Sequence, residues 1–192
     1  MTRDAAADAA APLAAARFLA APTLASYMDA AQKNKDLWLA VYRRAQVPPE
    51  LLERAAAVDG RWHLLVLSED WCGDAFNTVP FLGRLAELAP NLDLRVLARD
   101  ANPDLMDAHL TNGSRSIPVA IVLDADFRER GWWGPRPREL QRWVLGEGQT
   151  LPKEERYREV RRWYVQDRGR TTLEEIVELL ERAAGDVITR NE

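Results

Sequence analysis

The single cysteine of the chain, Cys72, is the side chain whose type and position most clearly suggest chemistry. It follows an apolar run at residues 63–67 that is too short for a helix and is typical of a strand buried on both faces. Apolar residues then recur at helical spacing from Phe76 to Leu88, so Cys72 is expected at or just before the first turn of a helix. The free N–H groups of such a turn favour negative charge, which lowers the pKa of a thiol and increases the reactive thiolate.

Two considerations oppose this interpretation. Asp74 stands two residues after Cys72, and its carboxylate disfavours a second negative charge nearby. A free cysteine is, moreover, commonly a small buried apolar side chain without a chemical role. The local sequence therefore leaves a nucleophile and a packing residue open as about equal alternatives.

Three segments, taken in order, resemble the motifs of thioredoxins. Residues 71–75, Trp-Cys-Gly-Asp-Ala, resemble the Trp-Cys-Gly-Pro-Cys turn of that family. Residues 100–103, Asp-Ala-Asn-Pro, follow an expected strand at 92–98 and resemble its Asp-x-Asn-Pro. Residues 113–118, Gly-Ser-Arg-Ser-Ile-Pro, precede the apolar run 119–123 and resemble its Gly-x-Arg-x-Ile-Pro segment. The chain is therefore identified as similar to thioredoxin-like proteins, in a branch whose turn reads Trp-Cys-Gly-Asp-Ala.

This resemblance implies an α/β thioredoxin-like fold, in which helices flank a central mixed β-sheet. It also implies that the peptide bond before Pro118 is cis and that this proline lies against the Cys72 turn. The backbone of Ser116 and Ile117 would then pair with an extended substrate. The neighbours of the thiol that would shape access to it are Trp71, Gly73 and Asp74.

Three positions depart from the thioredoxin pattern. Ala75 stands where thioredoxins have a second, resolving cysteine, so no internal disulfide can form. Val66 and Val96 stand where the family buries an aspartate and a lysine that help to ionise that second thiol. A buried charge costs several kcal/mol in desolvation, so apolar replacements fit a site without the dithiol cycle.

Two functions remain open. In the first, Cys72 is the catalytic residue of a monothiol thiol-disulfide oxidoreductase, and a thiol from solution resolves the mixed disulfide. Its partners would be a thiol- or disulfide-bearing protein or a small thiol. In the second, the chain is a redox-inactive binding module that uses the groove beside Pro118 for a peptide or protein. The first is favoured, because a Trp-Cys-Gly turn at a helix start is more than a binding groove requires.

Composition narrows the classes of partner and cofactor. The 192 residues carry a net charge of −4, which offers no general attraction for nucleic acid. One cysteine suits a reducing, cytoplasmic location. The two histidines, His63 and His109, lie outside any metal-ligand spacing and are interpreted as structural, so we expect neither a metal nor another cofactor.

Residues 1–22 are rich in alanine but do not have the pattern of a signal peptide. Asp4 and Asp8 stand where a signal peptide is basic. Pro12 and Arg17 interrupt the apolar stretch. A transmembrane helix needs roughly 18 apolar residues in a row, and no such window occurs. We expect a helical or frayed arm and no association with a membrane.

The chain is expected to have three parts. Residues 1–60 are an N-terminal helical extension, 61–145 the thioredoxin-like core, and 146–192 C-terminal helices that pack on the core. In the extension, helices are expected at 23–44 and 49–59. In the core, we expect a helix at 103–110 capped by Asn102, a turn at 124–126 into a strand at 127–133, and a helix after Pro137. In the C-terminal part, helices are expected at 152–166 and 171–185, the last with a capping-box spacing from Thr171 to Glu174.

Two stretches outside the thioredoxin motifs have alternative interpretations. Residues 131–137 are expected close to the active-site turn, and Trp132 or Trp133 together with Arg136 could line the site. Packing of the rings and solvation of the arginine are favoured instead. The helix at 152–166 carries clustered arginines that could hold an acidic partner, but interleaved acidic residues favour a solvated face.

Overall fold

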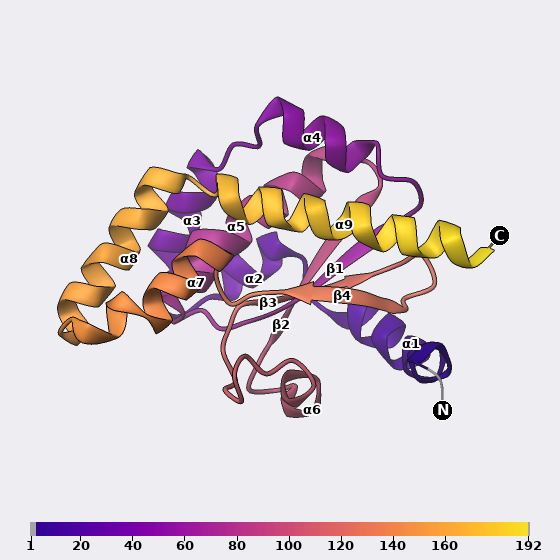
Figure 1. The fold of residues 1–192 in the computed structure, drawn as a ribbon, viewed down its shortest axis with the longest axis horizontal. Helices are drawn as coiled ribbons and strands as arrows, with labels where there is room; N and C mark the ends of the chain where they lie inside the picture. Colours follow the sequence, from indigo (N-terminus) through magenta and orange to yellow (C-terminus); the bar gives the residue numbers. More distant parts are fainter. Residues whose placement is uncertain (1–2, 192) are drawn as a thin grey trace.

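A computed structural model describes residues 3–191, with side chains for residues 10–186. They contain a four-stranded sheet in the order β2-β1-β3-β4, with helices packed around it (Figure 1). The strands are β1 (Trp62–Ser68), β2 (Leu92–Ala98), β3 (Val119–Leu123) and β4 (Glu129–Trp133). β1 pairs parallel with β2 and antiparallel with β3, and β3 pairs antiparallel with β4. The expected α/β fold with a central mixed sheet is therefore confirmed.

The helices differ in what they pack against. They are α1 (Arg3–Ala20), α2 (Leu24–Ala30), α3 (Lys35–Arg44), α4 (Pro49–Ala56), α5 (Gly73–Leu88), α6 (Pro103–Asp107), α7 (Arg138–Leu145), the 3-10 helix η1 (Glu147–Thr150), α8 (Lys153–Asp167) and α9 (Arg170–Asn191). α9 contacts β4, α5 and α4, and α3 packs on α5. α7 and α8 pack on each other around Leu140, Val160 and Tyr164 and extend from one end of the sheet (Figure 1).

β1 lies inside the sheet because its side chains are apolar enough to be covered on both faces. Every residue of the strand is buried, and Leu64, Val66 and Leu67 have no exposed surface. The chain leaves β1 at Ser68 and enters α5 at Gly73. The Cys72 turn therefore lies at the end of a fully buried strand.

The helix expected at 23–44 is in fact two helices. The chain breaks between α2 and α3, where Asn34 takes a left-handed conformation with φ 55°. The break directs the N–H groups of Gln32 and Lys33 to one carboxylate oxygen of Asp70, at 2.8 and 2.9 Å. Helical periodicity hides this break, because its cause is a contact with a distant part of the chain.

The helix expected at 103–110 is shorter than predicted. α6 ends at Asp107, and the Asn102 side chain makes no cap hydrogen bond to it. Instead, the Asn102 amide donates to the Ala98 carbonyl oxygen at 2.9 Å. The side chain thus ties the loop to the end of β2 rather than to the helix.

The last helix begins earlier and ends later than predicted. α9 starts at Arg170, and the Asp167 carboxylate accepts the Thr171 backbone N–H at 3.1 Å. The Asp167 side chain, at the end of α8, therefore supplies a capping hydrogen bond to the first turn of α9. α9 also continues beyond Gly185.

The N-terminal arm is helical over the described range. α1 includes Pro12, while the side chains of Asp4 and Asp8 lie outside the described set. Phe18, near the end of α1, packs its ring 4.7 Å from that of His63 on β1. Among the described residues, no helix combines the length and apolarity needed to cross a membrane.

Candidate functional site

Cys72 is the N-cap residue of α5, with φ −80° and ψ 121°. Its thiol donates a hydrogen bond to the Ile117 carbonyl oxygen at 3.5 Å. The peptide bond between Ile117 and Pro118 is cis. Cys72 is 7% exposed. The thiol therefore lies between the start of α5 and the segment that leads into β3.

The turn before Cys72 is held by the N-terminal helices. The Asp70 carboxylate accepts the two N–H groups of Gln32 and Lys33 at the break between α2 and α3. The Asp70 carbonyl oxygen accepts the indole N–H of the buried Trp38 at 3.0 Å. The part of the chain expected as an extension thus positions the site, which sequence reasoning did not indicate.

The thiol of Cys72 is held in its protonated form. Burial raises its pKa from 9.0 to about 11, and the Asp74 carboxylate acts in the same direction. Hydrogen bonds from the backbone of Ala75 and Asp74, and the charge of Arg136, favour the thiolate but do not outweigh burial. The helix start therefore acts in the expected direction, but burial and Asp74 outweigh it and the net pKa is raised.

The Asp74 carboxylate joins three parts of the fold. The Arg136 guanidinium, from the loop after β4, lies 2.5 Å from Oδ2. The Tyr164 hydroxyl, from α8, donates to Oδ1 at 2.9 Å. Burial raises the pKa of Tyr164 well above its usual value and Asp74 adds to this, so the group stays a phenol and donates. Asp74, beside the thiol, is thereby neutralised and fixed.

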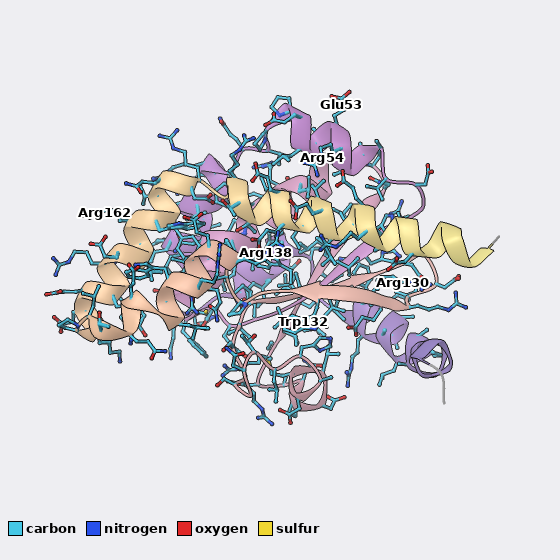
Figure 2. All side chains as sticks on the ribbon, in the orientation of Figure 1. Glu53, Arg54, Arg130, Trp132, Arg138 and Arg162 are labelled. Carbon is cyan, nitrogen blue, oxygen red and sulfur yellow. The ribbon has the colours of Figure 1, made fainter. Side chains whose placement is uncertain are left out.

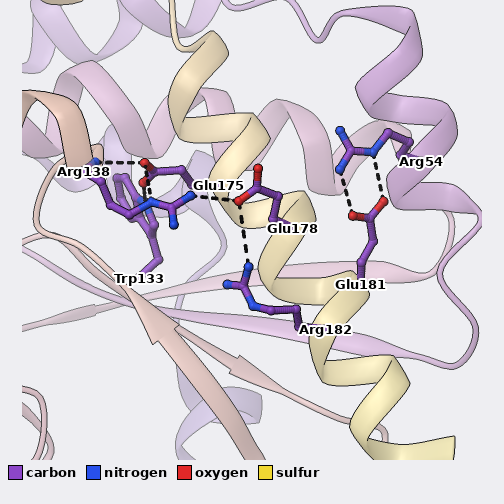
Figure 3. Close-up of polar contacts among 7 residues, drawn as sticks. All are labelled: Arg54, Trp133, Arg138, Glu175, Glu178, Glu181 and Arg182. Carbon is purple, nitrogen blue, oxygen red and sulfur yellow. Dashed lines mark hydrogen bonds and ion pairs between the residues drawn. The ribbon is translucent and has the colours of Figure 1, made fainter.

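Gly134 and Glu175 position the loop after β4. A Cβ atom at Gly134 would lie 2.1 Å from the Pro118 carbonyl oxygen, and its φ of 135° also favours glycine. The buried Glu175 of α9 accepts the Trp133 indole N–H at 2.7 Å and the Arg138 backbone N–H at 2.9 Å (Figure 3). α9 therefore holds the loop at both of its ends.

These elements border an open cleft of about 740 Å³. One wall, the core wall, consists of the Cys72 turn, the start of α5, the segment 115–117, Arg99 and Arg136. The other, the α8 wall, comes from the end of α7, η1 and α8. The predicted site residues that line the cleft are Trp71, Cys72, Gly73, Asp74, Ser116 and Ile117. Pro118 is buried and does not line it.

The positions that depart from the thioredoxin pattern are all apolar and buried. Val66 and Val96 are direct partners in the pairing of β1 with β2, and neither has exposed surface. Ala75 is likewise fully buried. Since the sequence has no second cysteine, these positions provide neither a resolving thiol nor a group to ionise one.

The stretch 131–137 contributes one of its three candidate side chains to the cleft. Arg136 lines it. Trp133 is turned to Glu175, as described above. Trp132 points from β4 toward α6 (Figure 2), where its ring lies 5.8 Å from that of His109. The tryptophans therefore pack away from the thiol.

The two histidines make different contacts within the fold: His63 packs against aromatic rings, and His109 makes hydrogen bonds. His63 stacks on Phe127 at 4.5 Å between ring centroids. His109 bonds through Nδ1 to the Leu105 carbonyl oxygen at 2.7 Å and through Nε2 to Glu129 at 3.1 Å. Within the described part of the chain, no group of three or more His, Cys, Asp or Glu side chains is arranged to hold a metal ion.

The sequence did not place α8 at the cleft, although its clustered arginines were considered as a site for an acidic partner. Its cleft-lining residues are Arg156, Tyr157, Val160, Arg161 and Tyr164. The stripe formed by Tyr157, Val160 and Tyr164 indicates a covered helix face. That stripe does not say which element covers the face.

Comparison with known proteins gives a family match and similar folds. A family model described as thioredoxin matches residues 21–160. The fold is similar to that of a protein of unknown function from Pseudomonas aeruginosa, with a TM-score of 0.69 and 22% identity over 86% of this chain and 95% of that one. An HIV epitope scaffold is also similar, with a TM-score of 0.68 and 19% identity over 87% and 96%. No curated protein matches the sequence.

Proposed function

Because the chain belongs to the thioredoxin family, we propose that it binds an extended segment of a partner protein across the Cys72 turn and residues 116 and 117. In this function the cleft recognises the partner. Cys72 contributes a protonated thiol at the floor of the site and is not a nucleophile in the resting state.

The state of the thiol carries this proposal. Cys72 is 7% exposed although it borders an open cleft, and its pKa is raised to about 11. At neutral pH such a thiol is ionised in only about one molecule in ten thousand. A more basic thiolate is a stronger nucleophile, but on a logarithmic scale this gain in rate offsets less than half of the loss in thiolate fraction. Binding of a partner does not require a thiolate, so this site suits binding better than thiol exchange.

Groups beside the thiol support recognition of a polypeptide. Among the described residues, none accepts a hydrogen bond from the Ile117 backbone N–H, which leaves this donor for the carbonyl group of an extended segment. Trp71 is 42% exposed at the rim and offers aromatic contact area. Both features suit a chain laid along the core wall.

A second candidate is monothiol exchange, which is supported by the groups that favour the thiolate, namely the backbone of Ala75 and Asp74 and the charge of Arg136. The Cys72 thiolate would attack one sulfur of a partner disulfide, and the other sulfur would leave as a thiolate. A small thiol from solution would then attack the mixed disulfide as its thiolate and release Cys72.

Selection of peptides from a random library displayed on phage, performed under reducing conditions against wild type and Cys72→Ser in parallel, separates the two functions. Serine keeps a donor for the Ile117 carbonyl oxygen, so the site should stay in shape. The binding function predicts the same peptides for both proteins, with affinities within about twofold. It also predicts amide shift changes at Trp71, Ser116 and Ile117.

Two results would contradict this function. In the same selection repeated under oxidising conditions, peptides that all contain cysteine and that bind wild type but not Cys72→Ser would favour exchange. Shift changes confined to another surface, or the absence of any selected peptide, would show that the cleft is not a peptide groove.

A further inference from the structure

α8 presents two arginines to the cleft and keeps its acidic residues away from it. Arg156 and Arg161 line the α8 wall. Glu159 pairs with Arg162 at 3.1 Å, and Arg162 lies on the outer side of the helix (Figure 2). Asp167 is engaged by the first turn of α9. None of the four carboxylates of α8 lines the cleft, so the interleaving seen in the sequence does not neutralise this wall.

The arginines of the core wall, unlike those of the α8 wall, each form an ion pair with an acidic side chain. These pairs are Arg99–Asp100 at 2.8 Å, Arg115–Asp107 at 2.6 Å and Arg136–Asp74 at 2.5 Å. In contrast, no described carboxylate lies within ion-pair distance of Arg156 or Arg161. Asp74 is the one acidic side chain among the described residues that line the cleft, and it is already neutralised.

The positive surface continues past Tyr164. A second open cleft of about 640 Å³ shares Asn77 and Tyr164 with the first. It is lined by Arg43, Arg44 and Arg168, and no described acidic side chain lines it. A surface of this extent on a chain with net charge −4 indicates an anionic ligand longer than a small ion.

We propose that the partner segment received by the cleft is acidic and places its carboxylates opposite Arg156 and Arg161. This inference rests on the proposed function and names the chemistry of the partner. Arginine suits the task because its planar fork binds carboxylates through two parallel N–H groups. A polypeptide is favoured over nucleic acid, since the core wall offers the Ile117 N–H to a peptide carbonyl and the chain as a whole is negative.

The test uses fluorescently labelled peptides of equal length with alternating Glu-Ser, Gln-Ser or Lys-Ser, and a single-stranded DNA oligonucleotide with the charge of the Glu-Ser peptide. Fluorescence anisotropy measures their binding to the full chain at two ionic strengths. The variant is Arg161→Glu. Its matched control is Arg158→Glu, which makes the same charge change at an exposed position of α8 that lines neither cleft.

We expect the Glu-Ser peptide to bind about tenfold more tightly than the Gln-Ser peptide, and added salt to reduce this difference. Arg161→Glu should weaken the Glu-Ser complex about fivefold, whereas Arg158→Glu should change it less than about twofold. Circular dichroism confirms that both variants are folded.

The alternative outcomes are distinguishable. If Glu-Ser and Gln-Ser peptides bind equally and Arg161→Glu has no effect, the acidic partner is wrong while the peptide groove stands. If Arg158→Glu weakens the Glu-Ser complex as much as Arg161→Glu does, the binding is nonspecific electrostatic attraction and the inference is overturned. Tighter binding of the oligonucleotide than of the Glu-Ser peptide would replace the partner by nucleic acid. If no peptide binds, the proposed function falls together with this inference.

Discussion

Both walls of the cleft contain arginines, which are ion-paired on the core wall and have no described ion-pair partner on the α8 wall. On the core wall, each arginine is neutralised by an acidic neighbour, and Arg136 is largely buried with its partner Asp74. On the α8 wall, Arg156 and Arg161 face the cleft with no described ion-pair partner. An arginine can therefore be part of the scaffold on one side of a site and available to a ligand on the other.

Solvent access separates Arg136 from Arg161. The side chains of Arg136 and Asp74 are 22% and 13% exposed, and an unpaired charge at such a depth would cost several kcal/mol. Arg161 is exposed on a helical arm, where water solvates an unpaired guanidinium at little cost. Loss of Arg136 should therefore affect stability, and changes on the α8 wall should affect binding.

The largest effect is expected behind the core wall, where Gly134 packs against Pro118. Gly134→Ala forces a methyl group against the Pro118 carbonyl oxygen at a φ that side chains rarely adopt, and we expect a loss of about 3 kcal/mol in the free energy of unfolding. Urea denaturation measures it. Gly73→Ala is the control, since its Cβ meets nothing within 4 Å, and it should change stability by less than about 1 kcal/mol. Similar losses for the two variants would contradict the close packing behind the core wall.

The second prediction compares the two walls directly. Arg136→Met leaves Asp74 largely buried without its cation and should lower the free energy of unfolding by about 2 kcal/mol. Arg161→Met removes an exposed, unpaired charge and should change it by less than about 0.5 kcal/mol. Denaturation of the two variants under one set of conditions provides the test. An equal loss for both would remove the distinction between the walls.

The smallest effect concerns the field that the α8 wall exerts on Cys72. The rate ratio of alkylation by anionic iodoacetate to that by neutral iodoacetamide reports this field, because the fraction of thiolate cancels in the ratio. We expect Arg156→Glu with Arg161→Glu to lower the ratio about threefold relative to wild type, and Arg158→Glu to leave it within about 1.5-fold. A ratio that stays constant in the double variant would mean that α8 does not influence the site.

The core wall could be predicted from the sequence because its determinants are local. The apolar run of β1, the helical spacing after Cys72 and the segment before Pro118 are each readable from a few consecutive residues. The family match and the mixed sheet agree with that prediction. The buried valine pair, Val66 and Val96, was also located from the motif spacing.

The remaining features depend on contacts between distant segments. The break between α2 and α3 follows from hydrogen bonds to Asp70, which helical periodicity cannot reveal. The stripe of α8 indicated a covered face, but the bond from Tyr164 to Asp74 is what brings that helix to the site. The net pKa of Cys72 could not be predicted, because the effect of the helix start is local, whereas burial is produced by the whole fold.

The rate of Cys72 alkylation by iodoacetamide as a function of pH, with Cys72→Ser as the blank, tests whether the resting thiol is protonated. A protonated thiol predicts slow reaction at neutral pH and a midpoint near the raised pKa of about 11, well above the value of roughly 8.5 for a free cysteine. Fast reaction with a midpoint below roughly 8.5 would contradict it, because the resting site would then hold a working nucleophile.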